Sequence, residues 1–209
     1  MNVFRETIKK DWIWRDFFLT ELTTGLRRGE LCGLKWSDFD EEAGTLNVCR
    51  TIHARKGGGV EEGTTKTYAG TRTILLPSST AQLLRERKKS ALTEWIFPDL
   101  LCPEKPVSPG SAYRRLKGLL EEAGLPDLRF HDLRHTFATH ALASGVDAKT
   151  LSGILGHTKA SFTLDTYTHV TGDMHRNAAE IVGDFMTELL GEEMEPWQSS
   201  ESGETAVST

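Results

Sequence analysis

The sequence predicts a mostly helical α+β domain that carries a small antiparallel sheet. Two patterns support this fold class. Apolar residues recur at helical spacing over residues 12–26 and over most of the chain after residue 78. Between these parts, residues 45–52 and 72–76 alternate apolar and polar side chains, as half-buried strands do. With 209 residues, 38% of them hydrophobic, the chain can build one core.

The first predicted helix covers residues 12–26. Its apolar positions at helical spacing are Trp14, Phe17, Phe18 and Leu22. Gly25 suits the end of this helix, because glycine adopts the left-handed conformation of a C-terminal cap at little cost. A second, short helix is expected from about residue 28 to residue 36, so Arg27 lies at the junction between two helices.

The two predicted strands, residues 45–52 and 72–76, flank a segment rich in glycine and charge. Residues 54–64 of this segment are expected to form a loop, and Lys66 lies near the turn that follows. The expected element is therefore a small antiparallel sheet with a mobile tip.

After residue 78 the pattern is mostly helical. Helices are predicted over residues 79–92, 108–122, 131–144, 148–155 and about 171–190. Three glycines suit the ends of these helices: Gly124, Gly145 and Gly156. Asp147 is a candidate N-cap, because its carboxylate can accept the free backbone N–H groups of the first turn.

Residues 187–209 differ in composition from the rest of the chain. They hold six glutamates and no lysine or arginine, so the net charge of −5 becomes +1 over the first 186 residues. Their content of serine, glutamate and glycine is typical of a disordered tail. We therefore expect a folded domain over residues 1–186 and an acidic tail over 187–209.

Charge is also uneven within the predicted domain. Residues 50–90 carry nine lysines and arginines against three glutamates, and residues 105–160 carry eight basic against five acidic side chains. A solvated face is the ordinary meaning of such a run. DNA binding depends on basic side chains that neutralise phosphates, and the first run includes Lys66, so this distribution favours a DNA-facing surface.

Neither a disulfide framework nor a membrane span is indicated. The three cysteines, Cys32, Cys49 and Cys102, are odd in number and widely spaced, so we expect small buried apolar residues in a reducing cytoplasm. No apolar run approaches the roughly 20 residues of a membrane span, and the N-terminus lacks the apolar stretch of a signal peptide. A soluble, cytoplasmic protein is expected.

Five short segments carry polar residues that would suit cleavage of a phosphodiester. They are TGLRRGEL (24–31), TKT (65–67) with RTILLP (72–77), HDLRH (131–135), LGH (155–157) and TLDTYTH (163–169). In these segments and in their order, from about residue 11 to residue 185, the chain resembles the catalytic domain of the tyrosine recombinases, the phage-integrase family. The resemblance implies that family's catalytic-domain fold. Nothing in the chain corresponds to the N-terminal core-binding domain of larger members.

The resemblance assigns catalytic roles to Arg27, Lys66, His131, Arg134, His157 and Tyr167. Arginine forks match phosphate oxygens and can stabilise the negative charge that grows in the transition state. His131 and Arg134 are three residues apart, so a helix would present both on one face. Glu30 is an obvious ion-pair partner for Arg27, either as a structural pair or as the carboxylate that orients this arginine in the family.

Tyr167 is the expected nucleophile, and Lys66 is the expected proton donor to the departing 5′ oxygen. A free phenol has a pKa near 10, so deprotonation at pH 7 costs roughly 4 kcal/mol, which nearby cations and a base must offset. Attack would leave a 3′-phosphotyrosine and a free 5′-hydroxyl. Because the phosphate bond energy is kept, resealing would need no ATP, metal or other cofactor.

The implied function is site-specific recombination of double-stranded DNA for a phage or mobile element, by four protomers on two DNA segments. Type IB topoisomerase-like relaxation and a non-catalytic DNA-binding module are the alternatives. A metal site at His131 and His135 is the weaker interpretation, because neither HExxH nor a carboxylate cluster accompanies them. Residues 178–190 carry an apolar stripe that would dock on a neighbouring protomer or pack in the core of their own chain.

Overall fold

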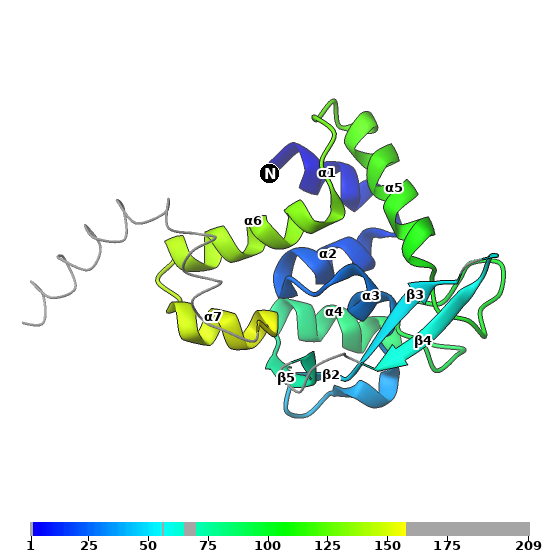
Figure 1. The fold of residues 1–209 in the computed structure, drawn as a ribbon, viewed down its shortest axis with the longest axis horizontal. Coiled ribbons are helices and arrows are strands. Elements are labelled where there is room, and N and C mark those ends of the chain that lie inside the picture. The colour runs from blue at the N-terminus through cyan, green and yellow to red at the C-terminus, as the bar shows by residue number, and fades with distance from the viewer. Residues whose placement is uncertain (1, 56, 65–69, 158–209) are drawn as a thin grey trace, which may run out of the picture. The chain divides into compact units, whose positions relative to one another are not determined.

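The computed structural model describes residues 2–55, 57–64 and 70–157. Within these residues the chain forms seven α-helices, one 3₁₀ helix and two small antiparallel sheets, so the mostly helical α+β fold class is confirmed (Figure 1). Lys66, Tyr167, the predicted helix over 171–190 and the acidic tail lie outside the described residues. None of the described helices is both long and apolar enough to cross a membrane.

Helix α2 (Arg15–Thr24) lies between the other helices (Figure 1). It begins later than the helix predicted over residues 12–26, because the Asp11 carboxylate accepts the backbone N–H groups of Ile13 and Trp14 in a turn before it. The predicted end at Gly25 is confirmed, since this residue has a φ of 59° and its N–H bonds to the carbonyl of Glu21.

Helix α1 (Asn2–Lys10) precedes this turn and was missed by the sequence analysis. Its buried residues are Phe4 and Ile8, which lie one helical turn apart among charged neighbours. Three apolar residues, two of them adjacent, do not establish a helical period in so short a segment.

The second helix is shorter than predicted. Helix α3 covers Arg28–Cys32, and a separate 3₁₀ turn, η1 (Trp36–Asp38), begins where the predicted helix was expected to end. The Asp38 carboxylate accepts the backbone N–H of Lys35 at 2.8 Å and so organises this separate turn.

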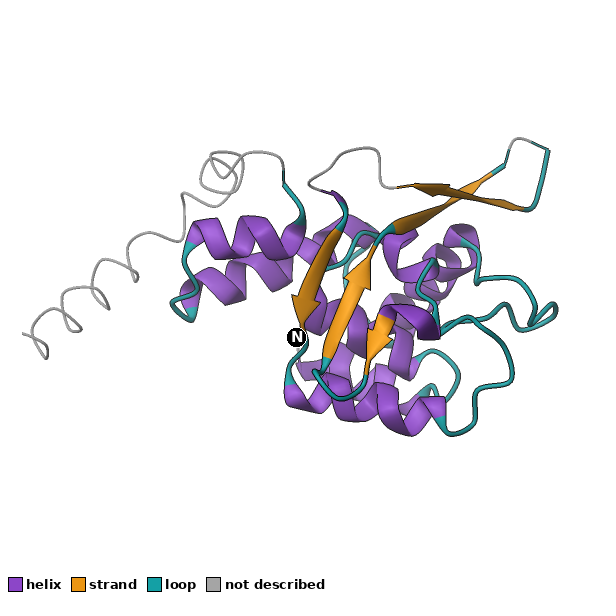
Figure 2. Ribbon diagram, turned by 90° about the horizontal axis from the view of Figure 1, so that it is seen from below, coloured by secondary structure: helices purple, strands orange, loops and turns teal. Residues whose placement is uncertain are grey.

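The strand predicted over residues 45–52 is in fact two strands that belong to different sheets. The order of the first sheet is β1-β2-β5, and β3 and β4 form a separate hairpin that extends from its end (Figure 2). The strands are β1 (Phe39–Asp40), β2 (Thr45–Val48), β3 (Arg50–Ala54), β4 (Val60–Thr64) and β5 (Arg72–Leu75). The break falls at Cys49, so the continuous alternation along the sequence crosses from one sheet to the other.

The loop predicted over residues 54–64 is wrong in its second half. Strand β4 pairs with β3 in a regular antiparallel register that runs from Arg50 opposite Thr64 to Ala54 opposite Val60. Residues 57–59 are glycines with positive φ and lie in the connection between the two strands. The segment VEEGT carries one large apolar residue, so alternation could not reveal this strand.

The remaining helices follow the prediction closely. They are α4 (Ser78–Lys88), α5 (Pro109–Glu122), α6 (Phe130–Ala143) and α7 (Ala148–Leu155). Helix α4 stops before the predicted residue 92, because the N–H groups of residues 89–91 bond three residues back and tighten its end. Asp147 caps α7 as predicted, with its carboxylate accepting from the N–H groups of Lys149 and Thr150.

Aromatic rings join the helices around α2. The ring of Phe17 lies 5.3 Å from that of Phe18, 5.1 Å from that of Phe97 and 6.2 Å from that of Phe130. Helix α6 is thereby held against α2. Of the cysteines, Cys32 is fully buried as expected, whereas Cys49 and Cys102 are only partly buried, because they lie beside the core and not within it.

Gly25, at the end of α2, packs tightly against Phe137 of α6. A Cβ atom at this position would lie 2.4 Å from Cδ1 of Phe137. Gly25 therefore meets two separate demands, a left-handed backbone and the absence of a side chain.

We expect Gly25→Ala to lower the free energy of unfolding by about 2–4 kcal/mol, because the left-handed strain adds to the clash with Phe137. Gly124→Ala is the matched control. Gly124 has a φ of +61° with nothing within 4 Å of its Cβ position, so it should lose only about 1 kcal/mol. Urea unfolding of both variants separates the two costs, and equal losses would show that the contact with Phe137 is unimportant.

Candidate active site

The C-terminal end of α7 is where the candidate site assembles. The last carbonyls of a helix have no partner inside it. Three consecutive carbonyls here each accept a hydrogen bond from a different arginine. The donors are Arg72 Nε to Ile154 at 2.6 Å, Arg134 Nη2 to Leu155 at 2.5 Å and Arg27 Nη2 to Gly156 at 3.0 Å.

A sharp turn after α7 positions these carbonyls. Gly156 has a φ of 65°, and the N–H of His157 bonds to the carbonyl of Ser152 at 3.0 Å, which closes the helix as in a Schellman motif. His157 therefore begins the segment that follows the helix, as predicted.

Glu30 is a buried carboxylate between two of these arginines. Its Oε1 lies 2.7 Å from Nη1 of Arg27, and its Oε2 lies 3.0 Å from Nη2 of Arg72. Burial alone would raise the pKa of Glu30, but the hydrogen bond and charge of Arg72, followed by those of Arg27, outweigh it and lower this pKa. Glu30 is thus a fixed anion beside three cations.

Arg72 was not predicted as a site residue. The sequence placed it only at the start of a strand, and it does begin β5. Its role as a bridge from Glu30 to the end of α7 depends on neighbours that are distant in the chain. The stretch RTILLP, already noted for its resemblance, was the available signal.

Arg134 is almost fully buried, with 2% of its surface exposed. Its Nη1 donates to the carbonyl of Gly25 at 2.7 Å, and its Nη2 lies 3.0 Å from Nε2 of His157. Burial, together with the positive charge of Arg27, lowers the pKa of Arg134 to about 10. The guanidinium remains charged at neutral pH, but its burial and the neighbouring arginines outweigh the negative charge of Glu30.

The two histidines of the site are held neutral. Burial, followed by the charges of Arg134 and Arg27, lowers the pKa of His157 to about 4. Burial and the neighbouring His135 lower the pKa of His131. The rings of His131 and His135 meet edge to face with centroids 4.4 Å apart. Within the described residues, no three His, Cys, Asp or Glu side chains gather as a metal site.

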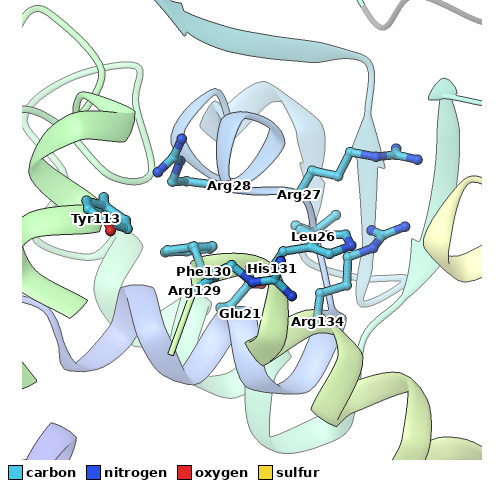
Figure 3. Close-up of a pocket in the computed structure, with 9 residues that line it drawn as sticks. All are labelled: Glu21, Leu26, Arg27, Arg28, Tyr113, Arg129, Phe130, His131 and Arg134. Carbon is cyan, nitrogen blue, oxygen red and sulfur yellow. The ribbon is translucent and has the colours of Figure 1, made fainter. Parts of the chain in front are cut away.

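A cavity of about 350 Å³ opens beside the arginines. Figure 3 shows Arg27 and Arg28 on one side of it, with Phe130 and His131 on the other. The lining residues are Glu21, Leu26, Arg27, Arg28, Tyr113, Arg129, Phe130, His131 and Arg134. The structure thus brings the predicted Arg27, His131 and Arg134 to one cavity, with His157 in contact with Arg134. Lys66 and Tyr167 lie outside the described residues.

Glu21 is an unexpected member of this lining. It is completely buried, and neither carboxyl oxygen has a hydrogen-bond partner within the described part of the chain. Burial raises the pKa of Glu21 well above its ordinary value, and the charge of Arg134 only partly opposes this. No sequence signal separated Glu21 from an ordinary helix glutamate.

Known proteins resemble this chain over most of its length. The sequence model of a protein family, described as the phage integrase family, matches residues 5–173. This chain belongs to the phage integrase family. Among curated relatives of this integrase-family chain, a tyrosine recombinase XerC-like protein of Caldanaerobacter subterraneus subsp. tengcongensis is 35% identical over 190 residues, which cover 80% of the chain and 48% of the relative. Tyrosine recombinase XerA of Pyrococcus furiosus is 34% identical over 180 residues, 84% of the chain and 57% of the relative.

Solved structures confirm the predicted fold of this integrase-family chain. The Tn1549 transposon integrase in complex with a circular intermediate DNA matches with a TM-score of 0.74 and 26% identity, over 86% of the chain and 62% of that structure. A XerA recombinase matches in fold with a TM-score of 0.65 and 24% identity, over 85% of the chain and 60% of that structure. The chain spans about half the length of the curated relatives that it matches.

We expect Glu30→Gln to destabilise the domain by about 3–5 kcal/mol at pH 7, because it leaves Arg72 and Arg27 without their buried anion. The folded-state pKa of Glu30 is lowered, so its contribution is present above its ordinary pKa of 4.5 and is lost as pH falls through the folded value. Chemical unfolding from pH 3 to pH 7 should show that the difference in unfolding free energy between the variant and the wild type shrinks in acid.

Glu86→Gln, in an exposed pair with Lys89, is the control and should change stability by under about 1 kcal/mol. An equal effect of both variants at pH 7 would contradict a structural role for Glu30.

Glu21→Met should have the opposite pH dependence. The folded-state pKa of Glu21 is raised, so its cost is absent below the ordinary pKa of 4.5 and grows as pH rises above it. The free energy of unfolding of the variant minus that of the wild type should increase by at least about 1 kcal/mol from pH 5 to pH 8. Thermal unfolding over this range measures the gain, and a difference that does not change with pH would refute it.

Proposed function

We propose that this chain is the catalytic domain of a site-specific DNA recombinase that cuts and rejoins strands through a 3′-phosphotyrosine. The observation that carries the proposal is the convergence of Arg27, His131 and Arg134 on one cavity. These residues come from the α2–α3 junction and from α6, and they match the family pattern in order. The family assignment supports the same conclusion.

The arginines have donors to spare for a phosphate. A guanidinium carries five N–H bonds, and Arg27 uses two of them, toward Glu30 and Gly156. Arg134 uses up to three, toward Gly25, Leu155 and His157. In-line displacement spreads negative charge over the phosphate oxygens, and losing one such donor typically costs on the order of 10²- to 10³-fold in rate.

The proposed roles of the histidines follow from their neutrality. A neutral imidazole can accept a proton, so His131 is the candidate partner for the proton of the attacking phenol. His157 is the candidate hydrogen-bond partner of a phosphate oxygen, next to Arg134. Burial, followed by neighbouring positive charges, lowers the pKa of each ring and opposes its charging, so proton acceptance by His131 is favoured only once the anionic phosphate is bound.

The proposed reaction needs two further residues, which come from the resemblance alone. The Tyr167 oxygen would attack the phosphorus and form the 3′-phosphotyrosine while the bond to the 5′ oxygen breaks. The departing 5′ oxygen would take its proton from Lys66. Reversal of the same steps by a 5′-hydroxyl from another strand would reseal the DNA, without a nucleotide or metal cofactor.

The proposed partners are double-stranded DNA and further protomers of the recombinase. Support for the DNA comes from the Tn1549 transposon integrase, which was solved in complex with a circular intermediate DNA. Assembly of four protomers on two DNA segments is proposed from the family resemblance. The catalytic domain would cover residues 1–186, followed by the acidic tail over 187–209, in a protein that acts in the cytoplasm.

The test is a nicked suicide duplex that carries the cognate recombination site. We expect a covalent adduct on a denaturing gel, mapped to Tyr167 by mass spectrometry and abolished in Tyr167→Phe without loss of DNA binding. Binding without any adduct would favour a non-catalytic DNA-binding module. Relaxation of a supercoiled plasmid that lacks the site would favour a topoisomerase.

A further inference from the structure

The cavity continues past the residues assigned to the scissile phosphate to another arginine, Arg28. The guanidinium carbon of Arg28 lies 5.7 Å from the ring centroid of Tyr113 and 5.9 Å from that of Phe130. A cation near the face of an aromatic ring is attracted by the ring's negative face. The two rings thus help to hold the charge in place.

Arg28 differs from the other basic residues of this cavity in what it binds. Arg27 pairs with Glu30, and Arg129 pairs with Asp132 at 2.8 Å. Arg134 donates to backbone carbonyls. Within the described residues, Arg28 donates to no carboxylate and to no carbonyl. A cation beside a cavity whose donors are unused is suited to an anionic ligand.

The surroundings of Arg28 indicate what kind of anion would bind. Figure 3 places Arg28 next to Arg27, across the opening from Phe130 and near Tyr113. Tyr113 is 39% exposed, and the amine of Lys117 lies 4.9 Å from the centroid of its ring. Aromatic rings beside phosphate-binding cations can pack against the nucleotides of a DNA strand, on the base where the strand is single and on the sugar where it is paired.

We propose that Arg28 and Tyr113 form a second nucleotide subsite, in which Arg28 binds the phosphate next to the scissile one and Tyr113 packs on the intervening nucleoside. The proposal rests on the proposed function, because it takes the scissile phosphate to lie at Arg27 and Arg134. The cavity has the volume of a small-ligand site, about 350 Å³, and its lining includes Arg28 as well as Arg27 and Arg134. Arg28 thereby fixes the register of the cleaved strand.

The first experiment measures binding to a nicked duplex as a function of salt. Arg28→Met keeps an apolar stem against the two rings and removes the charge. We expect roughly threefold to tenfold weaker binding and a slope of log K against log salt that falls by about 0.9, the value of one phosphate. Arg28→Lys should retain the slope. Arg5→Met is the control, because Arg5 lies on α1 in an exposed pair with Glu6.

The second experiment locates the phosphate. Neutral methylphosphonates replace single phosphates on both sides of the nick, and adduct formation is measured for the wild type and Arg28→Met. One linkage adjacent to the scissile position should slow the wild type and have no further effect on the variant. Equal sensitivity of both proteins at every linkage would overturn the proposal.

These outcomes separate the subsite from the function on which it rests. If the wild type binds DNA and forms the adduct while Arg28→Met behaves as Arg5→Met does, only the subsite is refuted. If the wild type forms no adduct with any substrate, the proposed function fails first. Thermal unfolding of Arg28→Met and Arg28→Lys shows whether a loss of DNA binding or of adduct formation comes from a loss of folding. Tyr113→Leu, which should also weaken DNA binding, tests the subsite at a second residue.

Discussion

Repulsion among like charges is the constraint on which the candidate site depends. Arg27, Arg72 and Arg134 converge on the end of α7, where the carbonyls and the helix dipole supply partial negative charge. The carboxylate of Glu30 supplies a full negative charge. Burial, followed by the positive charge of Arg27, still lowers the pKa of Arg134. An anion in the cavity, such as the phosphate of the proposed function, would therefore stabilise this group of arginines.

The same constraint ties the site to the whole described fold. Its arginines come from the α2–α3 junction, from β5 and from α6, and their acceptors lie on α7, so no local segment could form it alone. Arg134 also donates to the carbonyl of Gly25, where the end of α2 packs tightly against Phe137 of α6. The packing of α2 against α6 and the position of the Arg134 guanidinium therefore depend on each other. Burial, followed by the charges of the neighbouring arginines, also keeps His157 neutral.

Much of this could be predicted from the sequence, and the failures have physical causes. The sequence predicted α2, α5, α6 and α7 well. The signals were the helical spacing of apolar residues, the glycines at helix ends and the N-cap Asp147. Helix α1 and strand β4 carry too few apolar residues to show a period. Motif order predicted the residues that meet at the cavity, but Glu21 and Arg72 acquire their roles only from distant neighbours. The roles of Lys66 and Tyr167 stay predictions.

The acceptors at the end of α7 are backbone carbonyls, and this has a consequence for how the domain can vary. A side-chain acceptor disappears with a single codon change, whereas a carbonyl is supplied by any residue. Substitutions at Ile154 can therefore alter packing without removing the group that holds Arg72. Gly156 is different, because its left-handed turn directs the chain and few other residues adopt it. In a library of random variants, intolerance at this end of the helix should concentrate on the glycine.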